Sequence, residues 1–157
     1  SDYIDVMFDL RQGLVPLLDL KQEKQVHNVC LRLIRDRLIT SAHDCSEGGL
    51  AVAVAECCIT GPDGVLGATL DISSTLRTDA LMFGESQSRI VISFPPEHRA
   101  GVEKLARQGG SDFAVIGQTG GTHLTVNISG VEFIREDANV LKSAWNDPLG
   151  KYGRQIT

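Results

Sequence analysis

Two short polar stretches of this chain hold most of the side chains that could do chemistry. The first is the segment 41–50, whose candidate residues are His43, Asp44, Ser46, Glu47, Gly48 and Gly49. The glycine pair opens an apolar run, and glycines at such a place let a backbone come close to a ligand at the mouth of a buried helix. The N–H groups at the start of that helix would favour a phosphate or another polar substrate.

The same stretch has a structural interpretation, which stays open. Ser46 can cap the helix, Glu47 suits its first turn, and the glycine pair permits close packing. Asp44 and Glu47 would repel a phosphate unless a metal ion bridged them. A single histidine beside an aspartate is common in buried hydrogen-bonded pairs, so the pattern does not select His43 as a general base.

The second polar stretch precedes an apolar strand at 90–94. Its five polar side chains are Glu85, Ser86, Gln87, Ser88 and Arg89. Gln87 can donate and accept hydrogen bonds, and Arg89 can bind a carboxylate or phosphate with two nitrogens. This combination suits a substrate with amide and phosphate groups. The alternative is an internal ion pair from Glu85 or Asp44 to Arg89, which would hold the two stretches together.

The remaining reactive residue types form no recognisable site. His27, His98 and His123 lie far apart in the sequence, and no two histidines have the i, i+4 spacing of a metalloprotease helix. No phosphate-binding glycine loop of the Walker type, dinucleotide fingerprint or nucleophile elbow is present. The four cysteines, of which Cys57 and Cys58 are adjacent, lack Cys-x-x-Cys spacing. They indicate reduced thiols and no metal site.

Composition is that of an ordinary globular chain. With 157 residues, of which 42% are hydrophobic, we expect one domain with a core large enough to fold unaided. A net charge of -5 argues against nucleic-acid and anionic-membrane surfaces. No apolar run approaches the roughly 20 residues of a spanning helix, and the start resembles no signal peptide. We therefore expect a cytoplasmic protein.

Periodicity predicts helices early in the chain, with strands between them. Asp19 and Gln22 form a variant capping box for a helix to Leu38, whose apolar stripe is Val26, Val29, Cys30, Leu33, Ile34 and Leu38. A strand at 39–42 should precede the polar turn 43–49 and a buried helix at 48–59. After the turn at 61–64, a strand at 65–72 and a short helix at 73–82, capped by Ser74 or Thr75, are predicted.

The second half is predicted to be richer in strands. A strand at 89–94 leads to a helix that starts at Pro95-Pro96 and ends at Gly109-Gly110. Strands at 113–118 and 123–128 should form a hairpin around Gly120-Gly121, followed by a strand at 131–134 and a helix at 137–146. The fold class is therefore α/β or α+β, a mixed sheet with packed helices. We expect a linker at 1–18 without regular structure because of Gly13 and Pro16, the domain at 19–146, and a tail at 147–157.

Together and in this order, the two polar stretches resemble the last domain of the small, bacterial and archaeal type of phosphoribosylformylglycinamidine synthase. The matching residues are Ser41–Asp44, Ser46–Ala53 and Phe83–Arg89, with lesser matches at Leu18–Leu20, Ile116-Gly117, Gly120-Gly121 and Trp145. The resemblance covers nearly the whole chain. It departs at Val15-Pro16, where the family commonly has two prolines.

The resemblance implies the C-terminal domain type of the aminoimidazole-ribonucleotide synthetase superfamily. The complete enzyme would convert formylglycinamide ribonucleotide, ATP and glutamine-derived ammonia to formylglycinamidine ribonucleotide, with magnesium. Its partners would be the remaining domains of the same synthase, a glutaminase subunit and a small accessory subunit. Because the family places its ATP and metal ligands and its catalytic histidine in other domains, we expect no catalytic residue here and no activity of this chain alone.

The resemblance also implies which site of the enzyme Glu85-Ser86-Gln87 would belong to. In the first half of the family's enzyme an equivalent triplet touches the substrate, whereas this chain resembles the second half, where the corresponding place is an auxiliary nucleotide site. The candidates for substrate or nucleotide binding are His43, Asp44, Ser46, Gly48, Gly49, Glu85, Ser86, Gln87 and Arg89.

Two other functions remain as alternatives. One is a structural domain that only holds an auxiliary nucleotide. The other is the corresponding domain of a selenophosphate synthetase, a thiamine-phosphate kinase or a hydrogenase maturation protein, against which the Gly84–Arg89 motif argues.

Overall fold

The computed structural model describes residues 2–11 and 16–147, which form two compact units. The first unit comprises Ser1–Ala53 and Arg77–Val115, and the second comprises Val54–Leu76 and Ile116–Thr157. Gly13 and Val15 of the expected linker, and the tail beyond Asp147, lie outside the described residues. No helix of the described part is long and apolar enough to cross a membrane.

The first unit begins with two helices, α1 (Asp2–Phe8) and α2 (Leu20–Arg35). The predicted cap of α2 is confirmed, because Asp19 Oδ1 accepts hydrogen bonds from the N–H groups of Lys21 at 2.9 Å and Gln22 at 3.1 Å. Helix α1 was not expected within the linker. Helix α2 ends three residues earlier than predicted, since Arg37 adopts a left-handed φ of 55° that no α-helix can continue.

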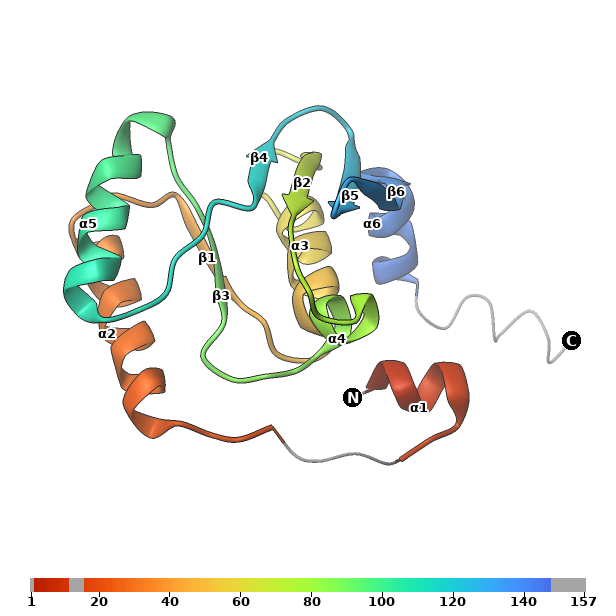
Figure 1. Cartoon of the computed structure of the whole chain (residues 1–157). Helices are drawn as coiled ribbons and strands as arrows, with labels where there is room; N and C mark the ends of the chain where they lie inside the picture. Colours follow the sequence, from red (N-terminus) through yellow and green to blue (C-terminus); the bar gives the residue numbers. More distant parts are fainter. Residues whose placement is uncertain (1, 12–15, 148–157) are drawn as a thin grey trace, which may run out of the picture. The chain divides into compact units, whose positions relative to one another are not determined.

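A two-stranded antiparallel sheet packs with α2 and α5 in this unit. Strand β1 (Ser41–Asp44) pairs with β3 (Ile90–Ser93), and the 3-10 turn η1 (Pro96–His98) leads into α5 (Arg99–Gly109). The two helices lie side by side (Figure 1). Their shared core contains Leu33, Val102 and Leu105, with Val29, Leu38, Ile39, Ile92, Phe94 and Phe113 packed against it.

Two details of the predicted first unit are wrong. The apolar stripe of α2 is narrower than expected, because the helix packs with one neighbouring helix and leaves Ile34 51% exposed and Cys30 half-buried. Strand β1 continues through His43 and Asp44, since its backbone stays paired with β3 as far as Ile90. These two residues therefore belong to a strand and not to the turn.

The two short connecting helices are α3 (Gly49–Ile59) and α4 (Thr78–Phe83). Helix α3 matches the prediction and buries most of its side chains. Helix α4 begins later than predicted, with Arg77 at the N-cap position and no side-chain cap. Ser74 does not cap it, because its Oγ accepts the N–H of Leu76 at 3.0 Å within the preceding turn.

The second unit is built on a mixed four-stranded sheet in the order β4–β2–β5–β6. The strands are β2 (Ala68–Ile72), β4 (Gly117–Thr119), β5 (His123–Ile128) and β6 (Val131–Asp137). The expected hairpin around Gly120-Gly121 is wrong: β4 pairs antiparallel with one edge of β2, and β5 pairs parallel with the other. The glycine loop instead bonds to Gly67 just before β2, through contacts of 2.8 and 2.9 Å.

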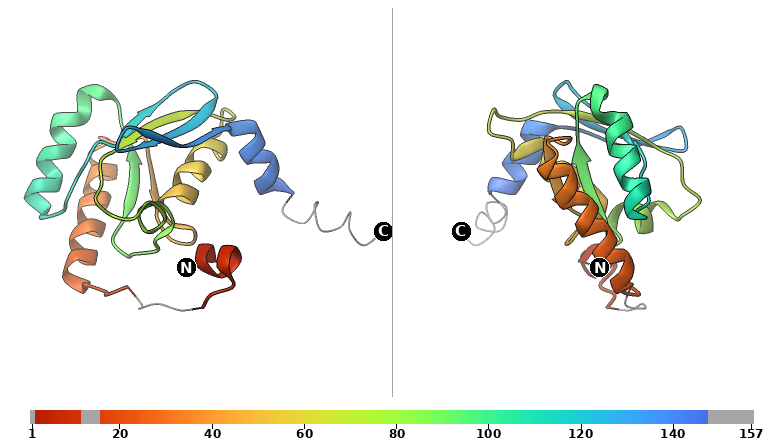
Figure 2. Two further views of the ribbon diagram at one scale, coloured as in Figure 1. Left: turned by 45° about the vertical axis from the view of Figure 1, so that its right-hand side comes forward. Right: turned by 90° about the vertical axis from the view of Figure 1, so that its left-hand side faces the viewer.

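The predicted turn and last helix of the second unit are confirmed, while the strand between them is three residues longer than predicted. Ser129 and Gly130, both with positive φ, turn β5 into β6, and β6 leads directly into α6 (Ala138–Asn146), as Figure 2 shows. Asp137 caps α6 by accepting the N–H of Asn139 at 2.7 Å. Alternate residues of β5 are buried, so the sheet has one apolar face.

Candidate functional site

The two polar stretches meet backbone to backbone in the first unit. Gly49 is the first residue of α3, is buried and has a φ of 66°. A β-carbon on it would stand 2.6 Å from the carbonyl oxygen of Gly84 and 2.8 Å from that of Met82. The approach therefore requires glycine, and it places the segment 84–89 beside the N-terminal end of α3. We call these two segments together the polar corner, comprising residues 43–49 and 84–89.

A carboxylate occupies the helix start in the polar corner. The N–H of Gly48 donates to Glu85 Oε1 at 3.2 Å, and both residues are half-buried. A negative charge at the N-terminal end of a helix is favourable, because the N–H groups there carry partial positive charge. Glu85 thus supplies from within the chain the interaction that a bound anion would supply, and it would oppose a phosphate that arrived without a cation.

Arg89 is directed at the end of α4. Its two terminal nitrogens donate to the carbonyl oxygens of Gly84 at 3.1 Å and Leu81 at 3.2 Å, and its side chain is half-buried. Positive charge at the C-terminal end of a helix satisfies carbonyl groups that lack a helical partner. The carbonyl of Arg89 also accepts the N–H of Cys45 at 2.9 Å. Arg89 therefore ties the ends of the segment 84–89 to each other and to the first stretch.

The remaining candidates of the first stretch differ in exposure. His43 is half-buried on β1, and its Nδ1 lies 2.7 Å from the carbonyl oxygen of Asp44. The side chains of Asp44, Ser46 and Glu47 are exposed. Ser46 contributes its carbonyl oxygen, which accepts the N–H of Gly49 at 3.1 Å. The contact of His43 agrees with its structural interpretation. Ser46 bonds to the helix start through its main chain and not through the side-chain cap that was expected. Two acidic side chains remain at the surface.

Ser86 and Gln87 are the exposed part of the second stretch, and Ser88 is turned inward. Ser88 has a left-handed φ of 64°, which is uncommon for a residue with a β-carbon. Its hydroxyl donates to Glu23 on α2, a partner that lies 65 residues away in the sequence. Glu23 was not among the candidates from the sequence, because an acidic residue in the first turn of a helix is expected at almost any helix start.

The polar corner also contains a buried thiol, that of Cys45. Cys45 follows β1 and is only 7% exposed. Burial raises its pKa, an effect that the positive charge of Arg89 partly offsets and the negative charge of Asp44 reinforces. Because the thiolate is the nucleophile, Cys45 is a poor candidate for covalent chemistry at neutral pH. Within the described part of the chain, no group of three or more His, Cys, Asp or Glu side chains could hold a metal ion.

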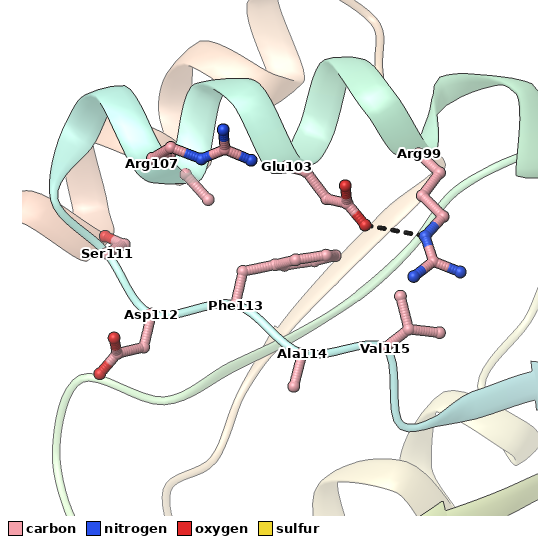
Figure 3. Close-up of a pocket in the computed structure, with 9 residues that line it drawn as sticks. Arg99, Glu103, Arg107, Ser111, Asp112, Phe113, Ala114 and Val115 are labelled. Carbon is pink, nitrogen blue, oxygen red and sulfur yellow. Dashed lines mark hydrogen bonds and ion pairs between the residues drawn. The ribbon is translucent and has the colours of Figure 1, made fainter.

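A separate cavity of about 440 Å³ lies along α5 and shares no residue with the polar corner (Figure 3). Arg99, Glu103 and Arg107 line it on the helix side, and the ring of Phe113 lies opposite them. Glu103 accepts from Arg99 Nε at 2.8 Å. With Asp112 on the rim, positive and negative charges balance, so the lining favours neither anions nor cations.

Comparison with known proteins decides the family. Residues 5–129 match the family model described as AIR synthase related protein, C-terminal domain. The chain belongs to this family. The fold class and the resemblance inferred from the sequence are thereby confirmed.

The curated relatives of this member of the AIR synthase related family are synthase subunits. The chain is 41% identical over 149 residues to the phosphoribosylformylglycinamidine synthase subunit PurL of Moorella thermoacetica, covering 95% of the chain and 20% of that protein. It is 36% identical over 149 residues to the protein of the same name from Alkaliphilus metalliredigens, with the same coverage of 95% and 20%. The chain thus spans about one fifth of the length of these relatives.

Solved structures agree on the fold of the family. The chain superposes on Thermotoga maritima PurL complexed with ATP with a TM-score of 0.72 at 19% identity, covering 84% of this chain and 23% of that one. For T. maritima PurL complexed with FGAR the TM-score is 0.72 at 18% identity, covering 88% and 24%. At these identities the likeness shows the fold alone.

Proposed function

We propose that this chain is the C-terminal domain of a phosphoribosylformylglycinamidine synthase, the ligase that makes formylglycinamidine ribonucleotide from formylglycinamide ribonucleotide, ATP and glutamine-derived ammonia. The observation that carries the proposal is the 41% identity to a PurL subunit across 95% of this chain. The match to the family model, over residues 5–129, includes both polar stretches. In this reading residues 1–18 connect to a preceding domain, 19–146 are the domain proper and 147–157 are a tail.

Within that enzyme, the polar corner is proposed to bind an auxiliary nucleotide or to hold the domain together. Glu85 and Arg89 both have partners inside the chain, which favours the structural role for those two residues. Ser86, Gln87, Asp44 and Glu47 are exposed and available to a ligand. Related T. maritima PurL structures are complexes with ATP, ADP and AMPPCP, which supports a nucleotide as the ligand class.

Magnesium would belong to the nucleotide in this proposal. Mg²⁺ is commonly held by one or two carboxylates together with phosphate oxygens and water. The exposed carboxylates of Asp44 and Glu47 fit that limited role, and the metal would offset the repulsion that Glu85 imposes on a bare phosphate. The chemistry that magnesium supplies is neutralisation of phosphate charge.

The complete synthase is proposed to work in the cytoplasm with a glutaminase subunit and a small accessory subunit. The structure of PurLQS from T. maritima, on which this chain superposes with a TM-score of 0.69, supports an assembly of several subunits. Those contacts would involve the whole synthase, of which this chain is one domain.

The test uses the full-length parent gene in a synthase-deficient strain. We expect the wild-type gene to restore growth without added purine, and the isolated chain of 157 residues to fail to do so. Failure of the full-length gene, expressed as soluble protein, would contradict the proposed activity. A matched variant pair, Ser86→Ala with Gln87→Ala against Ser73→Ala with Thr75→Ala, then separates the polar corner from another exposed polar loop.

Nucleotide binding is tested on the chain itself. We expect ADP with magnesium to raise its Tm, because a ligand that binds only the folded state stabilises that state. ADP with a chelator in place of magnesium should raise the Tm less, because Glu85 then repels the uncompensated phosphate charge. An unchanged Tm at millimolar nucleotide would leave the structural role as the function of the polar corner.

A further inference from the structure

A carboxylate from outside the loop holds the residue that follows the exposed candidates. Ser86 and Gln87 are followed by Ser88, the residue with the left-handed φ of 64°. A residue with a β-carbon stays in that conformation only when its surroundings hold it there. Among the described residues, the side-chain partner of Ser88 is Glu23 of α2.

Glu23 is itself fixed in place. Its Oε2 accepts from the hydroxyl of Ser88, and its Oε1 lies 2.8 Å from Nε2 of His27, one turn further along α2. The side chain of Glu23 is only 26% exposed, whereas that of His27 is 59% exposed. The carboxylate thus bridges a rigid helix and the loop, with both of its oxygens occupied.

We propose that Glu23 is a positioning residue for the ligand-binding part of the polar corner. By holding Ser88 in its left-handed conformation, it sets the direction in which the backbone presents Gln87 and Ser86 to a ligand. Arg89 fixes the base of the same loop through the carbonyl groups of Leu81 and Gly84. Glu85 ties the start of the loop to the N–H of Gly48, so Glu23 holds the part that lies between these contacts. This inference rests on the proposed function only where it concerns the ligand.

The test compares Glu23→Ala, Glu23→Gln and Ser88→Ala with a control, Glu103→Ala. Glu103 also pairs with a basic residue four positions away on a helix, at the same 2.8 Å, but it lies on α5 outside the polar corner. Two quantities are measured for each chain: amide hydrogen exchange of peptides covering residues 84–89, and the Kd for ADP with magnesium.

We expect Glu23→Ala and Ser88→Ala to speed exchange of the 84–89 amides about tenfold, which is the effect of losing roughly 1.4 kcal/mol of local stability. The Kd should rise by a similar factor. Glu23→Gln should stay close to wild type in both, because its amide oxygen can still accept from Ser88. Glu103→Ala should change neither.

Unchanged exchange at 84–89 in both Glu23→Ala and Ser88→Ala would overturn the positioning role. If one of these variants does not fold, the other removes the same hydrogen bond from the opposite side and decides the question. If wild type binds no ADP, the nucleotide proposal fails while the exchange measurement still decides the role of Glu23. Loss of loop protection in Glu23→Gln equal to that in Glu23→Ala would also count against it.

Discussion

The carbonyl oxygen of Gly84 lies 2.6 Å from the point where Gly49 would carry a β-carbon. This contact joins the start of α3 to the end of α4, and it brings together two stretches of the sequence that were recognised separately. The atoms around Gly49 belong to the backbone of Met82, Phe83 and Gly84, so no side-chain rotation can make room. The polar corner therefore depends on the absence of a side chain at one position.

Gly49→Ala should destabilise the chain by about 3 kcal/mol, from the left-handed conformation and from overpacking against backbone. The matched control is Gly121→Ala, since Gly121 has nearly the same φ, 68°, but no atom within 4 Å of its missing β-carbon. That control should lose only about 1 kcal/mol, the conformational part. Urea denaturation measures the free energy of unfolding of both variants. Equal losses of stability would show that the backbone contact at Gly49 leaves room for a β-carbon.

Arg89→Ala should lower the free energy of unfolding by about 2 kcal/mol, since two charge-assisted hydrogen bonds to half-buried carbonyl groups disappear. Arg89→Lys should recover only part of this, because a lysine cannot present two donors in a fixed fork. In a chain of this size the Tm would fall by about 6 °C for the alanine variant. Arg107→Ala, a change at an exposed arginine of α5, serves as the control, and a similar fall there would contradict the assignment.

Local features of this fold were predictable from the sequence because their causes lie within a few residues. Asp19 caps α2 through the N–H groups two and three positions ahead, and Gly110 ends α5 with a φ of 71°. The turn at Ser129-Gly130 and the cap at Asp137 have equally local causes. Each depends on residue types that satisfy particular backbone groups.

The features that were mispredicted depend on distant partners. Gly120-Gly121 has the composition of a hairpin turn and connects β4 to β5. These two strands do not pair with each other, because β2 lies between them and pairs in parallel with β5. The partners of Arg89 are main-chain carbonyl groups, which every residue possesses. The residue types in the sequence therefore could not predict these hydrogen bonds. The bond from Ser88 to Glu23 crosses 65 positions, and neither residue has an unusual sequence context.

The buried thiol of Cys58 should make the free energy of unfolding depend on pH in the alkaline range. Burial raises its pKa to about 11, and the neighbouring Cys57 adds to the shift. The folded state therefore favours the neutral thiol, whereas an unfolded chain ionises near the ordinary cysteine value of about 9. The resulting stabilisation is fully present below that ordinary value and is lost as the pH rises through the folded-state pKa.

Comparing wild type with Cys58→Ala isolates this contribution, because the other groups that titrate in the same range are common to both chains. Wild type should lose more stability than the variant between about pH 9 and pH 11. Alkylation at mildly alkaline pH, followed by mass spectrometry, checks the same point: Cys58 should react slowly in the folded chain and readily in denaturant. Parallel stability curves for the two chains, or rapid labelling of folded Cys58, would mean that the thiol ionises like an exposed one.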